Sequence, residues 1–199
     1  MSTGIAMAAL LASVLLAPTL LAAPDPDSAK LLKSTADHTK FKALQQEFGS
    51  GPEVTKACLT CHTEAAKQLH KTLHWKWEHK SPEGQILGKK HVINNYCTSV
   101  LSNQSNCSTC HIGYGFKDKS FDFTSEVNVD CLICHDTTGS YRKQSGLAGN
   151  VVTKPMEYPP GSGKMVKPID LQKIAQAVGM TSRDTCGACH FYGGGGDGV

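Results

Sequence analysis

The chain has 199 residues, enough for one or two domains, and a formal net charge of +3. A charge this close to neutral, with no tail or patch that suggests nucleic-acid binding, argues against that function. The segment 54–91 has seven Lys against three Glu, which indicates a solvated helix surface or, as the alternative, a local field that attracts small anions. The nine cysteines are therefore a stronger indication of function than the overall composition.

The chain begins with an apolar run over residues 5–23 that only three polar or proline residues interrupt. Small residues end the run, which predicts a secretory signal peptide over residues 1–23. No Lys or Arg precedes it and it nearly reaches membrane-spanning length, so an uncleaved anchor is the alternative. In either case we expect export to the periplasm, with membrane contact only if the segment is retained.

Three short helices are expected in the remainder of the chain. They cover residues 37–48, 62–79 and 168–178. The second has an apolar stripe of Ala66, Leu69, Leu73 and Trp77, and the third one of Leu171, Ile174, Ala175 and Val178. The segments 94–106, 116–128 and 146–167 predict irregular loops, the middle one with room for a short hairpin. The expected fold class is mainly α with much irregular loop.

One five-residue motif, Cys-x-x-Cys-His, occurs four times. The first to fourth motifs cover residues 58–62, 107–111, 131–135 and 186–190. About 0.02 chance matches are expected in a chain of this composition, so four are significant.

This motif is the attachment site of a c-type haem. Two thiols bond the porphyrin, and the histidine that follows becomes the proximal iron ligand. The sequence thus predicts four covalent haems whose faces supply much of the apolar interior. The attachment cysteines are Cys58, Cys61, Cys107, Cys110, Cys131, Cys134, Cys186 and Cys189, and the iron ligands are His62, His111, His135 and His190.

A second axial ligand is expected for each buried low-spin iron. His74 is the strongest candidate, because it borders the apolar stripe beside Trp75. His38 and His91 are further candidates, each with a surface histidine as the alternative. His70 and His79 are expected to face solvent or to form hydrogen bonds. Methionines 156, 165 and 180 are weaker candidates.

Cys97 belongs to no motif. In an exported protein a lone cysteine is a candidate for pairing, modification or reactivity, and the alternative is a buried inert thiol.

Several segments together resemble the octahaem tetrathionate reductase family. The resemblance runs from about residue 37 to residue 199, and its most specific parts are residues 90–97 and 190–199, with residues 37–41, 74–77 and 107–115 in support. The family carries eight haems, so residues 24–199 are expected to form its N-terminal tetrahaem part, cut off mid-domain.

The resemblance implies that the second haem is the catalytic one. It implies a pocket that contains Cys97 and Asn94, and a lysine as an iron ligand. Residues 170–173 match best, which gives Lys173 as that ligand with Asp170 beside it. The helical pattern places Lys173 opposite the apolar stripe, where a solvated lysine belongs, so this alternative stays open.

The leading functional hypothesis is a periplasmic reductase of a small sulfur or nitrogen compound: tetrathionate, nitrite or hydroxylamine. Its electrons would come from a donor cytochrome or a quinol dehydrogenase. A non-catalytic electron carrier is the main alternative. A zinc site formed by the cysteine pairs of the second and third motifs is a distant one, since a histidine directly follows all four pairs.

Overall fold

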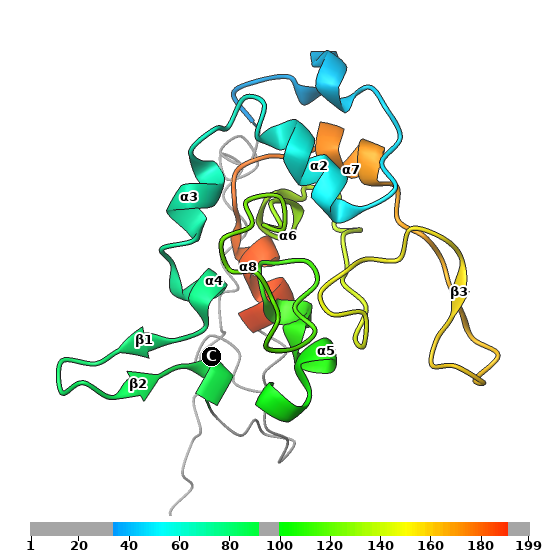
Figure 1. Ribbon diagram of the computed structural model, residues 1–199. Coiled ribbons are helices and arrows are strands. Elements are labelled where there is room, and N and C mark those ends of the chain that lie inside the picture. Colours follow the sequence, from blue (N-terminus) through cyan, green and yellow to red (C-terminus); the bar gives the residue numbers. More distant parts are fainter. Residues whose placement is uncertain (1–33, 92–99, 191–199) are drawn as a thin grey trace, which may run out of the picture.

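Short helices joined by loops make up the part of the chain that the computed structural model describes, residues 34–91 and 100–190 (Figure 1). The longest helices in this part, α2 (Gly51–Cys58) and α8 (Arg183–His190), have eight residues each. The others are α3 (Ala65–Leu69), α4 (Leu73–Lys76), α5 (Gln104–Cys107), α6 (Leu132–His135) and α7 (Leu171–Gln176), with 3-10 turns η1 (His38–Lys40), η2 (Lys42–Leu44), η3 (Lys89–His91), η4 (Val100–Ser102) and η5 (Ser108–Cys110). The fold is helix-rich with much loop, as expected.

The prediction of one helix over residues 37–48 is wrong. Phe41 has an extended backbone (φ −81°, ψ 120°) and separates η1 from η2. Asp37 caps η1 by accepting a hydrogen bond from the backbone N–H of Thr39, which favours a tight turn over a longer helix.

The predicted helix over residues 62–79 is also divided. The extended backbone at Thr72 separates α3 from α4, and the left-handed backbone of Trp77 (φ 55°) ends α4. The break rotates the apolar face: Leu73 is 58% exposed, whereas Trp75 is 1% exposed. The stripe inferred for a continuous helix therefore fails at Leu73.

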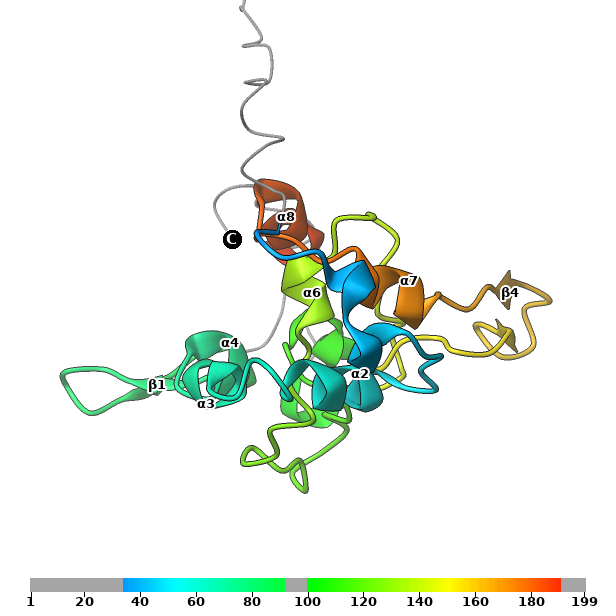
Figure 2. The ribbon, with the colours of Figure 1, turned by 90° about the horizontal axis from the view of Figure 1, so that it is seen from above.

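Two small hairpins project from opposite sides of the body (Figures 1 and 2). In one, β1 (His79–Lys80) pairs antiparallel with β2 (Ile86–Leu87). In the other, β3 (Met156–Glu157) pairs with β4 (Met165–Val166) inside the predicted loop 146–167. Both strand pairs have only two residues per strand, too few for an alternating pattern to show in the sequence.

Helix α7 confirms the predicted apolar stripe, since Leu171, Ile174 and Ala175 are buried. It begins three residues later than expected, because Asp170 caps it by accepting from the N–H of Lys173. α7 packs against α2, and α6 packs against α8 (Figure 1). The second of these contacts joins the third motif, in α6, to the fourth, in α8.

The core contains an aromatic cluster that we call the inner cluster: Trp75, Trp77, Phe116, Phe121 and Phe123, all around His111. The two Phe residues at 121 and 123 come from the predicted loop 116–128, which is confirmed as a loop and held by Asx turns at Asp118 and Asp122.

The leader, Asn94, Cys97 and the glycine-rich end fall outside the described residues. Within the described part, no helix is long and apolar enough to cross a membrane.

Candidate haem-binding site

The motif cysteines lie in pairs that join different motifs. Cys58 of the first motif shares a hydrogen bond with Cys131 of the third. Cys110 of the second shares one with Cys189 of the fourth. The cysteine attachment points of separate motifs are therefore close neighbours.

The shared proton shifts the acidity of each pair. The hydrogen bond from Cys189 lowers the pKa of Cys110 to about 6, with support from the charges of Lys89 and Lys143. The same hydrogen bond raises the pKa of Cys189. Such a pair releases its first proton more readily than an isolated thiol, which favours a nucleophilic thiolate.

The cysteines of the second and third motifs do not gather into one cluster, since Cys110 contacts Cys189 and Cys131 contacts Cys58. In the described part of the chain, no group of three or more His, Cys, Asp or Glu side chains is placed to hold a metal ion. The four-cysteine zinc site has no support in this geometry.

His38 and His62 face each other across a gap of haem dimensions. Their ring centroids are 6.4 Å apart and their planes differ by 13°. An iron bound by two imidazoles takes a nitrogen from each at about 2 Å, which sets the ring centres about 6 Å apart. The Nδ1 of His38 also lies 3.2 Å from the carbonyl oxygen of Ala36, the usual way to orient a ligating imidazole.

His74 and His190 form a second such pair. Their ring centroids are 6.2 Å apart, and their planes are nearly perpendicular at 80°. His74 comes from α4 and His190 ends α8, so distant parts of the sequence meet here.

His135 has the orientation of a proximal ligand. Its Nδ1 lies 2.8 Å from the carbonyl oxygen of Gly179, and the residue is exposed. Hydrogen bonding at Nδ1 leaves Nε2 for iron.

His111 differs from these histidines. It is fully buried in the inner cluster, with ring centroids 4.7–6.2 Å from its five aromatic neighbours. Its Nε2 lies 2.6 Å from the carbonyl oxygen of Trp75, and its Nδ1 is buried without a hydrogen-bond partner. Burial lowers the pKa of His111 to about 4, so the ring is neutral at physiological pH.

The residues fit covalent haem c at the first, third and fourth motifs as they stand. The second motif has the same donor set, but its histidine binds iron only once Nε2 leaves the Trp75 carbonyl.

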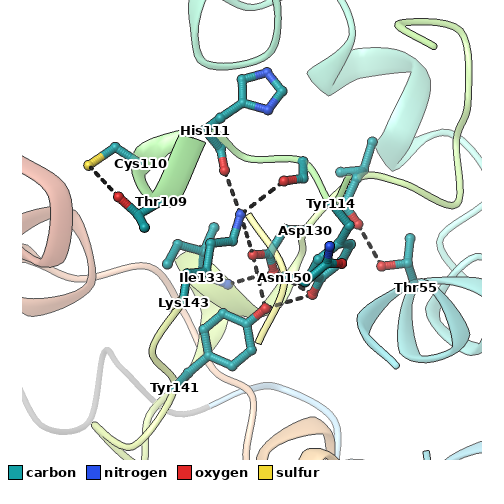
Figure 3. Close-up of polar contacts among 12 residues, drawn as sticks. Thr55, Thr109, Cys110, His111, Tyr114, Asp130, Ile133, Tyr141, Lys143 and Asn150 are labelled. Carbon is teal, nitrogen blue, oxygen red and sulfur yellow. Dashed lines mark hydrogen bonds and ion pairs between the residues drawn. The ribbon is translucent and has the colours of Figure 1, made fainter. Parts of the chain in front are cut away.

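A buried polar network beside the second motif was not predicted (Figure 3). Lys143 forms an ion pair of 2.9 Å with Asp130, and both side chains are at most 1% exposed. Tyr114 and Tyr141 donate to Asp130 at 2.8 and 2.9 Å. None of these four residues falls in a segment with an expected helix or apolar stripe, so no periodic pattern marked them as core.

The structure does not bring the predicted lysine to the second motif. Lys173 is exposed on α7, which packs against α2 of the first motif. Asp170 is engaged as the N-cap of α7. The lysine in contact with the second motif is Lys143, whose Nζ donates to the carbonyl of His111.

His91 forms a hydrogen bond with Glu78, with Nε2 2.7 Å from Oε2. That hydrogen bond, with a further one from Lys90, lowers the pKa of Glu78. No described motif histidine lies against His91, so its role as an iron ligand stays a prediction. His70 stacks on Trp75 with ring centroids 4.6 Å apart, and its Nε2 is buried without a hydrogen-bond partner, so the expectation that its ring faces solvent or forms hydrogen bonds is wrong at this atom.

Thiols of separate motifs are close neighbours, and two pairs of imidazole rings are separated by the distance that an iron between them would require. These features are typical of a c-type cytochrome with several haems. The comparisons agree. The family model described as cytochrome c554 and c-prime matches residues 57–136. A crystal structure of an octahaem cytochrome c from Shewanella oneidensis is 46% identical, with a TM-score of 0.66; the match covers 79% of this chain and 33% of that one.

No curated protein matches the chain. The chain belongs to the multihaem c-type cytochromes, and it spans about a third of the length of the Shewanella protein.

Proposed function

We propose that this chain carries four covalent haems in the periplasm and passes electrons along them to the second motif. There a small sulfur or nitrogen compound is reduced. Bound haem supplies reversible one-electron chemistry at the iron. Four complete attachment motifs and the similarity to an octahaem cytochrome c support the proposal.

The paired thiols carry the argument for an electron path. Cys58 contacts Cys131, which joins the first and third sites. The charge of Cys186 adds to the burial and the Asp130 charge that raise the pKa of Cys134, so the third and fourth sites are neighbours. Cys189 contacts Cys110, which joins the fourth and second. The path runs in the order first, third, fourth, second.

We assign His38 as the distal ligand of the first site and His74 as that of the fourth. Ring separations of 6.4 and 6.2 Å from the proximal histidines support these assignments. Two histidines at each iron give low potentials, which suits a reductase that delivers electrons to an oxyanion.

The catalytic pocket of the proposal consists of the second motif with Cys97 and Asn94. The resemblance supports these two residues, as it does Lys173, whereas the packing of α7 against the first motif argues against Lys173. Tetrathionate would accept two electrons as its central S–S bond breaks, giving two thiosulfates. The Cys97 thiolate would attack that bond as in thiol–disulfide exchange, releasing one thiosulfate and leaving the other bonded to the Cys97 sulfur. The two electrons delivered along the path would then break this S–S bond, releasing the second thiosulfate and restoring the thiolate.

Electrons would enter from a donor cytochrome or a quinol dehydrogenase. The second motif is at one end of the proposed path and the first at the other, so the first site is the expected entry point.

Cyanide binding distinguishes this function from that of a non-catalytic carrier. In a reductase one haem binds cyanide, seen as a spectral change in one haem of four. A carrier with four six-coordinate irons would show no change at any cyanide concentration, and the catalytic proposal would then be abandoned.

A Cys97→Ser variant tests the substrate. We expect it to impair tetrathionate reduction more than nitrite reduction, because only the first requires sulfur exchange. Thr98→Ser is the matched control and should leave both rates unchanged. Equal losses on both substrates in Cys97→Ser would contradict the sulfur chemistry.

A further inference from the structure

The Asp130–Lys143 ion pair is a buried charge pair in a chain whose proposed role is to move charge. Its atoms are 2.9 Å apart and its side chains are shielded from water. Removing two charges from water costs several kcal/mol each, and such a pair persists only when hydrogen bonds satisfy both partners.

Lys143 is fully engaged on the side of the second motif (Figure 3). Its Nζ donates to the carbonyl of His111 at 2.5 Å and to that of Gly113 at 3.2 Å, besides its bond to Asp130. The three donors of an ammonium group are thus all used. Lys143 is therefore a fixed positive charge and has no lone pair for an iron.

Asp130 is engaged on the side of the third motif. Its Oδ1 accepts from the backbone N–H of Ile133, inside that motif, at 3.1 Å. Tyr114 and Tyr141 complete its hydrogen bonds. Asp130 also directly precedes Cys131, so the negative end of the pair lies against the third site.

We propose that the oriented Asp130–Lys143 pair biases the electron path, favouring an electron at the second site over one at the third. The inference rests on the haem content proposed above. A positive charge in a medium of low dielectric stabilises a nearby added electron, and a negative charge opposes it.

The test is a redox titration of the haem-loaded protein followed by EPR. Low-spin iron between perpendicular imidazole planes gives a more anisotropic signal than iron between parallel planes. The planes of His74 and His190 differ by 80° and those of His38 and His62 by 13°, so the fourth and first sites have distinguishable signals. The two remaining haems are then those of the second and third sites, whose potentials are the ones to compare.

The decisive variant is the double substitution Asp130→Asn with Lys143→Met, which removes both charges and keeps the approximate shapes. We expect the second-site potential to fall relative to the third-site potential. A tenfold change in the electron's distribution between the two corresponds to 59 mV. Tyr141→Phe is the control: it removes one hydrogen bond, keeps both charges and should leave the separation unchanged.

A wild-type separation in a double variant that retains all its haems would overturn the inference. Fewer than four haems in the wild-type protein would instead contradict the proposed function.

A second measurement needs no variant. Salt screens surface charges but not a buried pair. The separation between the two potentials in the wild-type protein should therefore be the same at low and high ionic strength. A separation that collapses in high salt would assign the bias to surface charges and overturn the inference.

Discussion

Two regions of this molecule place the histidine of the same motif in opposite surroundings, one exposed and the other buried. At the first and fourth motifs the proximal histidines are exposed and face a second imidazole at 6.4 or 6.2 Å. At the second motif His111 is enclosed by the inner cluster, with its Nε2 on a backbone carbonyl. The motif therefore fixes the attachment chemistry, while segments distant in the sequence decide what each histidine meets.

Helix α4 contributes to both regions. Its His74 faces outward to His190, whereas the next residue, Trp75, is buried and accepts the hydrogen bond of His111. A four-residue helix can face two haem sites only because its neighbours point in different directions. Substitutions on the exposed side of α4 should therefore change the haem spectra, and substitutions in the buried core should change the stability of the fold.

The largest effect is expected at His74. His74→Ala removes one of the paired imidazoles, so one low-spin haem should become high-spin in the EPR spectrum. His70→Ala is the matched control from the preceding turn, and it should keep every low-spin signal because His70 stacks on Trp75. The same EPR response in both variants would mean that His74 is wrongly assigned as an iron ligand or His70 as a residue that only packs on Trp75.

In the buried polar network, Lys143→Met alone leaves Asp130 as an unpaired buried charge. Breaking one partner of such a pair costs about 3–5 kcal/mol. Chemical denaturation should show a loss of this size, and the double variant with Asp130→Asn should recover much of it. A single variant as stable as wild type would show that the pair is not buried in solution.

Gly51→Ala tests the packing between α2 and the buried network. A Cβ at this position would lie 2.2 Å from Cζ of Tyr114, so the ring must move away from Asp130. Overpacking of this kind costs about 1–3 kcal/mol. Gly49→Ala is the control, since its nearest contact would be a tolerable 3.4 Å to Glu53. Equal melting temperatures for the two variants would contradict the close approach.

The smallest effect is expected at Thr55. Its hydroxyl donates to the buried carbonyl of Val129 at 2.6 Å, and Thr55→Val should cost about 1 kcal/mol. Thr60→Val removes a comparable bond to Ala57 at an exposed position and should cost less. A larger loss of stability for Thr60→Val than for Thr55→Val would contradict the burial of the hydrogen bond between Thr55 and Val129.

The local sequence predicted the chemistry better than the geometry. The motifs are short and contiguous, so the membership among the multihaem cytochromes followed directly from them, whereas the individual attachment cysteines stay predictions. The stripe of α7 was correct because consecutive turns of one helix carry it. The helix over residues 62–79 failed because the left-handed backbone of Trp77 and the extended Thr72 depend on tertiary contacts rather than on propensity.

The buried network was out of reach of the sequence. Asp130 and Lys143 are 13 positions apart in irregular segments, and charged residues in loops are normally on the surface. Ring pairs such as His38 with His62 are set by contacts between segments, and only the individual candidates, not their partners, could be named in advance.

The central claim is that all four motifs carry covalent haem, the buried second one included. The mass of the intact, exported protein tests it most directly. The account predicts the mass of the mature chain plus four haems, with none released on denaturation. A mass with three haems, and unmodified Cys107 and Cys110 in the peptide map, would show that the second motif stays closed and would contradict the account.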